Sequence, residues 1–124
     1  MQPVNLFDLA SQQARWLSVR QAAVAGNIAN INTPGYRAVD VEPFENVLND
    51  TSVTMRATHA AHRYPGEEQP IAVKEQEGSP VLPSGNSVML EQELGKAGEI
   101  RRAFELNTAI VKAFHRMMMM TARG

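Results

Sequence analysis

The sequence contains no cysteine, so disulfide bonds, zinc–thiolate sites and thiol catalysis are all excluded. It also has no excess of one charge, because 12 basic and 13 acidic side chains leave a formal net charge of -1. A nucleic-acid-binding protein needs a clear basic excess to replace the counterions along phosphates, and an electrostatic membrane anchor needs one as well. The composition therefore argues against both kinds of partner.

Long apolar runs are also missing. No stretch approaches the ~20 apolar residues that span a bilayer. Residues 1–13 carry no basic side chain ahead of an apolar run, as a cleavable secretory signal would. We therefore expect that any export from the cytoplasm uses another route, without a cleaved signal peptide. What is present, 44% hydrophobic residues in a chain of 124, is typical of one modest globular unit.

The first helical pattern extends roughly from Val4 to Ile31 without an internal proline. Its apolar residues recur every three or four positions, interrupted at Gln21, which is the spacing of a coiled-coil seam. At 1.5 Å per residue such a helix is about 40 Å long. The seam residues are Phe7, Ala10, Ala14, Leu17, Val24, Ile28 and Ile31.

A second helical pattern follows Asn86 and Ser87, either of which can cap the first free backbone N–H groups. Its seam has the same spacing and consists of Ala97, Ile100, Phe104, Asn107, Val111, Phe114 and Met118. We expect a mainly α fold in which the two long terminal helices pair as an antiparallel coiled coil. The chain then divides into a helix and turn (1–35), an irregular middle segment with short strands (36–85) and a second helix (86–124).

The middle segment, Pro34 to Gly85, contains six prolines and many turn-forming residues. Val39 and Val41 alternate with acidic residues, which indicates a short half-buried strand. Further short extended pieces are expected at Val47–Met55 and Ile71–Val73, and loops at Tyr64–Pro70 and Gln76–Gly85.

Two long helices with one narrow seam each have little apolar surface to bury. Ordering a backbone residue costs about 1–2 kcal/mol, whereas burying a large apolar side chain returns about 1.5–3 kcal/mol. A single copy should therefore be marginally stable. Neighbouring copies would supply the missing burial, so the pattern favours self-assembly.

The first helix ends in the run Asn27-Ile28-Ala29-Asn30-Ile31-Asn32-Thr33-Pro34-Gly35-Tyr36. Asn30 and Asn32 can end a helix, because asparagine tolerates left-handed geometry and caps backbone groups. Pro34 and Gly35 then form a turn, in which glycine supplies a positive φ. Tyr36 should fold back onto the end of the helix.

This ten-residue run resembles the signature of the axial proteins of the bacterial flagellum, the rod, hook and hook-associated proteins. The resemblance continues at Asn86-Ser87-Val88, at Glu91 and Glu93, and at Arg102-Ala103-Phe104-Glu105-Leu106-Asn107. It covers both helices and more than half of the chain. We identify the chain as a member of the flagellar basal-body rod protein family. It is most similar to the short proximal members, because no insertion separates Thr33 from Gly35.

The resemblance implies a structural subunit of the proximal rod that is not an enzyme. Copies would be exported unfolded by the flagellar type III apparatus and self-assemble through their terminal helices into a helical tube in the periplasm-spanning rod. The tube would link the membrane ring and export gate to the distal rod and transmit torque. The implied partners are other copies, other rod proteins, the rod–ring adaptor and the membrane ring or export gate. No nucleic acid, small-molecule substrate, cofactor or metal is implied.

Two other functions are compatible with parts of the pattern. The chain could be a small coiled-coil adaptor or a type III export chaperone. It could also be a metal-dependent hydrolase using His59 and His62, although zinc sites need three or four ligands and no third is placed nearby. His115 should lie on the surface.

Three features of the helices leave alternatives open. Met117–Met120 is either an adaptable apolar contact surface or a helix end with Met118 inward. The polar seam residues Gln21 and Asn107 either set the register or are simply tolerated. The charges Arg15, Arg20, Glu99, Arg101, Arg102 and Glu105 form either a solvated face or pairs between subunits.

Overall fold

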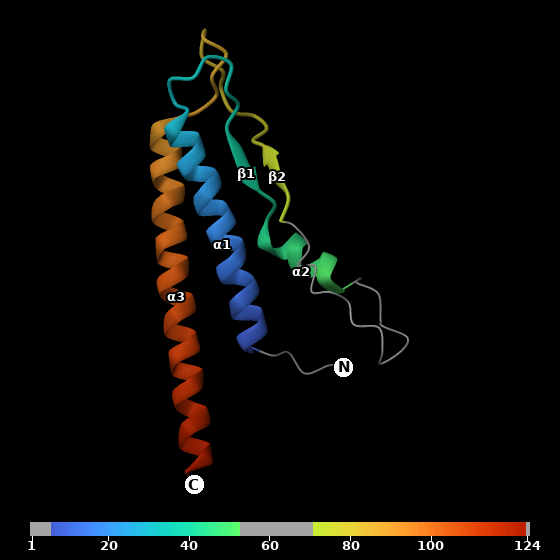
Figure 1. The fold of residues 1–124 in the computed structure, drawn as a ribbon, viewed down its shortest axis with the longest axis vertical. Coiled ribbons are helices and arrows are strands. Elements are labelled where there is room, and N and C mark those ends of the chain that lie inside the picture. The colour runs from blue at the N-terminus through green and yellow to red at the C-terminus, as the bar shows by residue number, and fades with distance from the viewer. Residues whose placement is uncertain (1–5, 53–70, 124) are drawn as a thin grey trace.

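The structure is a computed structural model that describes residues 6–52 and 71–123. Its elements in chain order are α1 (Leu6–Ala29), β1 (Val39–Val41), α2 (Phe44–Ser52), β2 (Val73–Glu75) and α3 (Leu90–Ala122). The two long helices lie side by side, and the strands and α2 lie against one side of the pair (Figure 1). The prediction of a mainly α fold with two paired terminal helices is confirmed.

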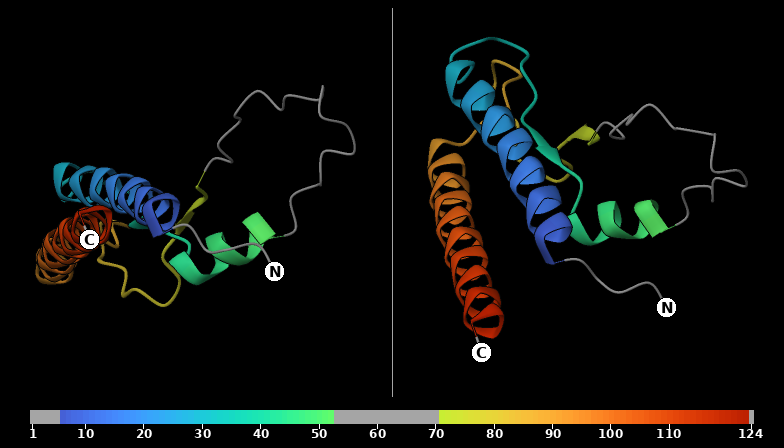
Figure 2. Two further views of the ribbon diagram at one scale, coloured as in Figure 1. Left: turned by 90° about the horizontal axis from the view of Figure 1, so that it is seen from below. Right: turned by 60° about the horizontal axis from the view of Figure 1, so that its bottom comes forward.

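The two long helices are antiparallel. Near one end of the pair, the rings of Phe7 and Phe114 meet edge to face with their centroids 5.3 Å apart. Near the other end, Asn27 donates a hydrogen bond to Glu93 over 3.0 Å. The start of α1 therefore lies beside the C-terminal part of α3, and the end of α1 lies beside the start of α3. Figure 2 shows the same arrangement. We call the end with the helix-connecting loops the upper end and the C-terminal end of α3 the lower end.

The hydrophobic core lies between the two helices and is small. Its centre is Leu17, Val24 and Ile100, each at most 3% exposed. Half-buried neighbours pack around it, namely Trp16, Ile28, Ala97, Ala103 and Phe104. Within the described residues, no helix combines the length and the hydropathy needed to cross a bilayer.

A two-stranded antiparallel sheet covers one side of α1. Val39 pairs with Glu75 and Val41 with Val73, so the strand predicted at Val39 and Val41 is confirmed. The indole N–H of Trp16 in α1 donates to the carbonyl of Glu42 over 2.7 Å. This bond attaches the end of β1 to the middle of α1.

One segment predicted to be extended is helical. Residues 47–52 belong to α2 (Phe44–Ser52), and residues 53–55 lie outside the described part. Phe44, Val47 and Leu48 have the i, i+3, i+4 spacing of one helix face, which the strand interpretation overlooked. The ring of Phe44 lies 5.7 Å from that of Trp16, so packing against α1 stabilises this short helix.

The start of the second helix was also predicted too early. α3 begins at Leu90, and the preceding Met89 is extended and makes no side-chain capping bond. The predicted caps Asn86 and Ser87 are buried and bind other segments, as described below. Residues 76–85 contain turns without helix or strand, as expected, whereas Tyr64–Pro70 lies outside the described residues.

Candidate functional site

The motif at the end of α1 reverses the chain within a few residues. The helix ends at Ala29, and the amide of Tyr36 donates to the carbonyl of Thr33 over 3.3 Å. Between them, Gly35 has the predicted positive φ, 76°. Proline followed by a residue of positive φ is the pattern of a type II turn.

Of the prediction for the two asparagines of the turn, the binding of a backbone group is confirmed for Asn30, whereas the left-handed geometry is not. Among the described residues only glycines have a positive φ, so neither Asn30 nor Asn32 adopts left-handed geometry. Instead, the Asn30 side-chain amide donates to the carbonyl of Gly26 over 2.8 Å. The same carbonyl also accepts from the backbone amide of Asn30 over 3.1 Å, so the side chain adds a second bond at the last turn of the helix. Asn32 is exposed.

Asn86, close in sequence to the start of α3, closes the end of α1. Its side-chain amide is shared among the carbonyls of Asn30, Ile31 and Thr33, at 2.8, 3.0 and 2.8 Å. Its side-chain oxygen accepts from the amide of Val88 over 2.7 Å. One residue, 1% exposed, therefore ties the exit from the first helix to the entry into the second. We call residues 30–36 and 84–88 the apex junction.

Two glycines make close contact in the apex junction. The amide of Gly35 donates to the carbonyl of Ser84 over 2.9 Å. Gly85 also has a positive φ, 81°, and a Cβ placed there would lie 3.2 Å from the Cα of Gly35. The Ser87 hydroxyl accepts from the amide of Ala38 over 2.8 Å. Backbone approach this close requires glycine at position 85.

Below the apex junction, the motif residue Asn27 joins three elements. Its side chain binds both backbone groups of Val39, donating to the carbonyl over 2.8 Å and accepting from the amide over 3.0 Å. It also donates to Glu93 and accepts from the Tyr36 hydroxyl at 3.3 Å. Asn27 has no exposed surface, so its hydrogen-bonding capacity is used within the protein. Tyr36 folds back onto the helix end, as predicted.

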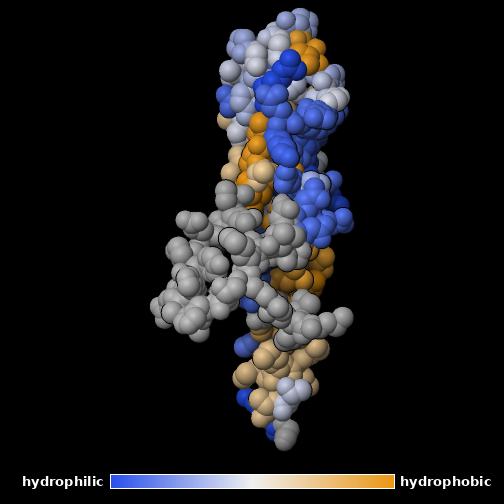
Figure 3. Space-filling view, turned by 90° about the vertical axis from the view of Figure 1, so that its right-hand side faces the viewer, coloured by the Kyte–Doolittle hydropathy of each residue, from blue (hydrophilic) through white to orange (hydrophobic). Residues whose placement is uncertain are grey.

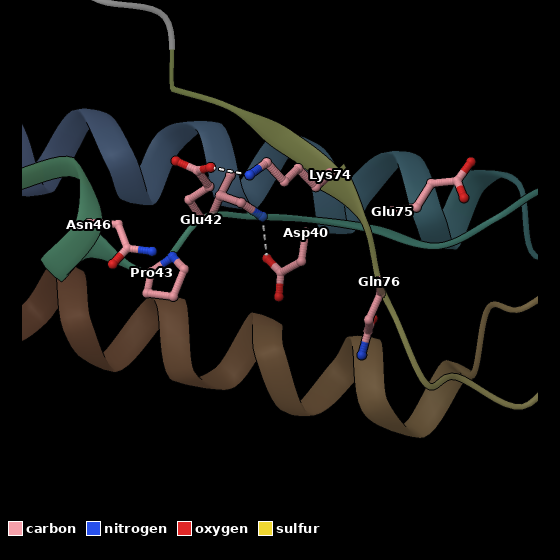
Figure 4. A pocket seen from close by; sticks show the side chains of 8 residues that line it. Asp40, Glu42, Pro43, Asn46, Lys74, Glu75 and Gln76 are labelled. Carbon is pink, nitrogen blue, oxygen red and sulfur yellow. Dashed lines mark hydrogen bonds and ion pairs between the residues drawn. The ribbon is translucent and has the colours of Figure 1, made fainter. Parts of the chain in front are cut away.

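Charged side chains extend this contact across the molecule. Glu93 is only 1% exposed and accepts from the Lys96 ammonium over 2.9 Å. The ammonium also donates to the Gln76 side chain over 2.8 Å and lies 3.8 Å from Asp40. Asp40 in turn pairs with Arg20, at 3.2 Å. Figure 4 shows Asp40 on β1 and Gln76 just after the end of β2.

Arg20 also reaches Glu99, at 3.4 Å. The result is a set of charged and polar groups that connects α1, β1, the residue after β2 and α3. We call it the charged network: Arg20, Asn27, Asp40, Gln76, Glu93, Lys96 and Glu99. Among the described residues, every buried side-chain nitrogen or oxygen has a hydrogen-bond partner.

A hollow beside the strands is lined mainly by charged and polar side chains. Its volume is about 270 Å³, and it is lined by Asp40, Val41, Glu42, Pro43, Asn46, Lys74, Glu75 and Gln76. Glu42 and Lys74 pair with each other across it. In the part of the chain that the structure describes, no group of three or more acidic or histidine side chains is placed to hold a metal. His115 is exposed, and His59 and His62 lie outside the described residues.

The predicted seam residues fall into three groups. Leu17, Val24, Ile100 and Asn107 are buried. Half-buried positions are Phe7, Ala10, Ala14, Ile28, Ile31, Ala97, Phe104, Val111 and Phe114. Met118 is 50% exposed, so the alternative that points it inward is wrong. It lies beyond Phe114, which already faces Phe7 near the first described residue of α1.

The two polar seam positions differ. Asn107 is 7% exposed and donates to the carbonyl of Ala10 over 2.9 Å, a bond that exists in one register of the helices. This favours a role in setting register. Gln21 is exposed and does not interrupt a buried seam. Of the motif, Asn27 is buried, Ile28, Asn30 and Tyr36 are half-buried, and Ala29, Asn32, Thr33, Pro34 and Gly35 are exposed.

Sequence reasoning missed most of the charged network. Glu93 was noted only for the family resemblance, and Asp40 and Lys96 for no binding role. The one available signal was position. Glu93 and Ile100 are seven residues apart and therefore share a helix face. The predicted seam of the second helix, extended toward its N-terminus, would thus have included the carboxylate of Glu93.

Comparison with known proteins identifies relatives of this chain. A family described as "Flagella basal body rod protein" matches residues 11–37. This range covers most of α1 and the turn that follows it. The flagellar basal body rod protein FlgB of Agrobacterium fabrum is 51% identical over 131 residues, covering 99% of this chain and 96% of that protein. FlgB of Buchnera aphidicola subsp. Acyrthosiphon pisum is 40% identical over 47 residues, 38% of this chain and 35% of that protein.

The fold and the junction define a helical hairpin that is closed at its upper end by hydrogen bonds between the two chain segments. With a relative of this identity over nearly its full length, the chain belongs to the FlgB family of flagellar basal body rod proteins. It is a structural component of the flagellar basal body.

Proposed function

We propose that this chain is a non-enzymatic subunit of the proximal rod that self-assembles through its terminal helices. In this role it links the membrane ring and export gate to the distal rod and transmits torque. Copies reach the rod through the flagellar type III export apparatus, and their neighbours are other copies, other rod proteins and the rod–ring adaptor. The proposal requires no cofactor.

The burial along α3 is the observation that carries this proposal. The helix α3 has 33 residues but contributes only Ile100 to the buried apolar residues between the helices. Eight of its large apolar side chains are at least 43% exposed. They are Leu90, Leu94, Leu106, Ile110, Met117, Met118, Met119 and Met120. Exposed apolar surface of this extent on a small protein marks an interaction site. The charged network meanwhile holds the upper half of the hairpin in one arrangement, which suits a subunit that carries load.

Fractionation of cells tests the proposed location and distinguishes the alternatives. A rod subunit should co-purify with intact basal bodies after the membranes are dissolved with detergent. An export chaperone or cytoplasmic adaptor should stay in the soluble fraction. Recovery of the tagged chain only in the soluble fraction of motile cells would overturn the proposal.

Replacement of Gly35 with valine should block rod assembly. Valine is β-branched and adopts φ near 76° only at a cost of about 1–3 kcal/mol. Nothing lies within 4 Å of a Cβ at this position, so we expect the effect to come mainly from backbone strain. The strain would misdirect the chain as it leaves α1, and every copy would repeat the fault. We expect Gly35→Val protein to be exported while the cells are non-motile in soft agar.

Gly78 offers a matched control, because it has a φ of 78° and equally open space around its Cβ position. It lies in the connection between β2 and α3, away from the apex junction. Gly78→Val should therefore cost similar stability and affect motility less. Changing His59 and His62 together to alanine should leave motility near normal. Loss of motility in the histidine variant with normal swimming of Gly35→Val would contradict the structural role.

A further inference from the structure

The last turns of α3 carry several side chains with nitrogen or sulfur atoms that bind metal ions. They are His115 and the four methionines at positions 117–120, and the helix continues past them to Ala122. His115 is exposed, and the methionines are 57%, 50%, 48% and 68% exposed in chain order. Figure 3 shows a mainly apolar surface at this lower end of the molecule. The imidazole and the thioethers are therefore accessible from solvent.

Helical spacing brings three of these side chains to one face. Met118 and Met119 follow His115 by three and four positions. Residues at these spacings are neighbours on a helix surface, with about 5–6 Å between their Cβ atoms. Methionine has three rotatable side-chain bonds, so both sulfurs can reach an ion that the imidazole binds. Two histidines four positions apart on a helix hold one zinc ion in metalloproteases by the same geometry. We call these three residues the soft-donor triangle.

The other two methionines lie on the opposite side of the helix. Successive residues of an α-helix are turned by about 100°. Met118 and Met119 are therefore turned from His115 by roughly 60° and 40°, whereas Met117 and Met120 are turned by roughly 160° and 140°. The imidazole of His115 and the sulfurs of Met117 and Met120 cannot share one ion without unwinding the helix.

The donor set selects the kind of metal ion. Residues 106–123 contain no carboxylate, so this part of α3 lacks the oxygen ligands that Mg²⁺ and Ca²⁺ require. Zinc takes imidazole, thiolate and carboxylate ligands, and His115 supplies only one of the three or four that a zinc site needs. Thioethers are soft donors that favour monovalent copper. The soft-donor triangle therefore fits a soft monovalent cation.

The neighbouring charges favour the same kind of ion. Lys112 precedes His115 by three positions and Arg116 follows it directly, and both are exposed. Their positive charge opposes the binding of any cation, and Coulomb repulsion grows with the charge of the ion. Salt screens the charge of exposed side chains. A monovalent ion held by uncharged donors is thus repelled less than a divalent one.

We propose that His115, Met118 and Met119 form a binding site for monovalent copper, with one imidazole nitrogen and two thioether sulfurs as its ligands. The helical backbone is already in place, so binding orders only side chains. The copper binds as Cu⁺ and keeps that oxidation state, so no electron transfer is involved. The site belongs to a single copy of the chain and does not depend on the proposed assembly.

Titration of the purified full-length chain with Cu⁺ under anaerobic conditions, in competition with a chromogenic chelator, measures this binding. The parent chain for all variants carries His59→Ala and His62→Ala, which leaves His115 as the single histidine. The parent should bind one Cu⁺ ion with an affinity that the following variants change. Met118→Leu with Met119→Leu should bind at least tenfold more weakly, because leucine keeps the volume and the helix propensity but has no sulfur. His115→Gln should weaken binding at least tenfold as well.

Met117→Leu with Met120→Leu is the matched control. It removes the same number of thioethers from the same turns of the helix, on the side away from His115. Its affinity for Cu⁺ should equal that of the parent chain. Circular dichroism should show the same helix content in all variants, since the substituted side chains are exposed. Zn²⁺ added to the parent chain should not bind stoichiometrically.

Three results would overturn the inference. They are no stoichiometric uptake of Cu⁺ by the parent chain, equal loss of affinity in the control and in the Met118 and Met119 variant, and Zn²⁺ binding as tight as Cu⁺ binding. Equal loss would mean unspecific capture by exposed thioethers. Failure of the proposed function would be recognised separately, because the fractionation of basal bodies measures location and not metal binding.

Discussion

Replacing Glu93 with alanine is expected to lower the free energy of unfolding by about 3 kcal/mol, the lower end of the range for removing one partner of a buried ion pair, because Asp40, 3.8 Å from the Lys96 ammonium, still compensates part of its charge. The ammonium of Lys96 lies 2.9 Å from the Glu93 carboxylate, and its side chain is only 11% exposed. Asn27 would lose an acceptor at the same time. A domain of this size is stabilised by roughly 5–15 kcal/mol in total, so the loss is a large share.

Urea unfolding followed by tryptophan fluorescence measures this effect. Trp16 is the single tryptophan, and it packs between Phe44 and the guanidinium of Arg20, so it reports on the contact between α1 and the strand layer. Glu91→Ala is the control, since Glu91 is exposed two residues away. It should change the unfolding free energy by no more than about 0.5 kcal/mol.

A double replacement separates charge from packing. If the buried pair matters because an unpaired charge is costly, Glu93→Met with Lys96→Leu should regain much of the stability that Glu93→Ala loses. Equal losses in the single and the double variant would show that packing at this place, and not the charge balance, holds the helices together. A loss below about 0.5 kcal/mol for Glu93→Ala would contradict the burial itself.

Asn86→Ala should cost about 2–4 kcal/mol of stability. The side chain serves the carbonyls of Asn30, Ile31 and Thr33 and the amide of Val88. Each buried polar group left without a partner costs about 1–3 kcal/mol, and the loss is limited because the carbonyls of Asn30 and Thr33 also accept from the backbone amides of Thr33 and Tyr36. Thermal unfolding followed by circular dichroism provides the measurement.

Two further variants identify the cause of that loss. Asn86→Asp keeps the acceptor for Val88 but replaces the donor with a carboxylate facing three carbonyls, so it should be at least as destabilising as alanine. Asn32→Ala, at an exposed position of the same turn, should be close to neutral. If aspartate restored wild-type stability, the bonds to the carbonyls of the α1 end would be irrelevant and the Val88 contact would explain the effect.

The regular elements could be predicted where a local pattern covers many residues. The spacing of Leu17, Val24 and Ile28 in the first helix, and of Ile100 and Phe104 in the second, repeats often enough to identify both helices and their pairing. The short elements could not be predicted as well. Residues 44–52 offered too few positions to separate a helix from a strand, and contact between Phe44 and Trp16 decided the outcome.

The candidate site divides in the same way. The turn at Thr33–Tyr36 and the positive φ of Gly35 follow from residues that are adjacent in sequence, because proline and glycine restrict or permit backbone angles locally. The role of Asn86 does not, since its three acceptors lie more than 50 residues away. Asn86 was a reasonable prediction as a cap for its own helix, but the carbonyls of the turn that follows α1 compete for the same side chain.

By itself, then, the sequence determined the two helices, their antiparallel seam, the turn between Thr33 and Tyr36 and the family. Each of these depends on neighbours along the chain or on a contiguous motif. Only the tertiary structure decided that Glu93 is buried, that Asn27 binds Val39, and that Leu106 and Ile110 stay outside the core. Burial depends on which segments meet in space. The local sequence pattern of charged and apolar side chains on one helix is the same whether or not another segment covers them.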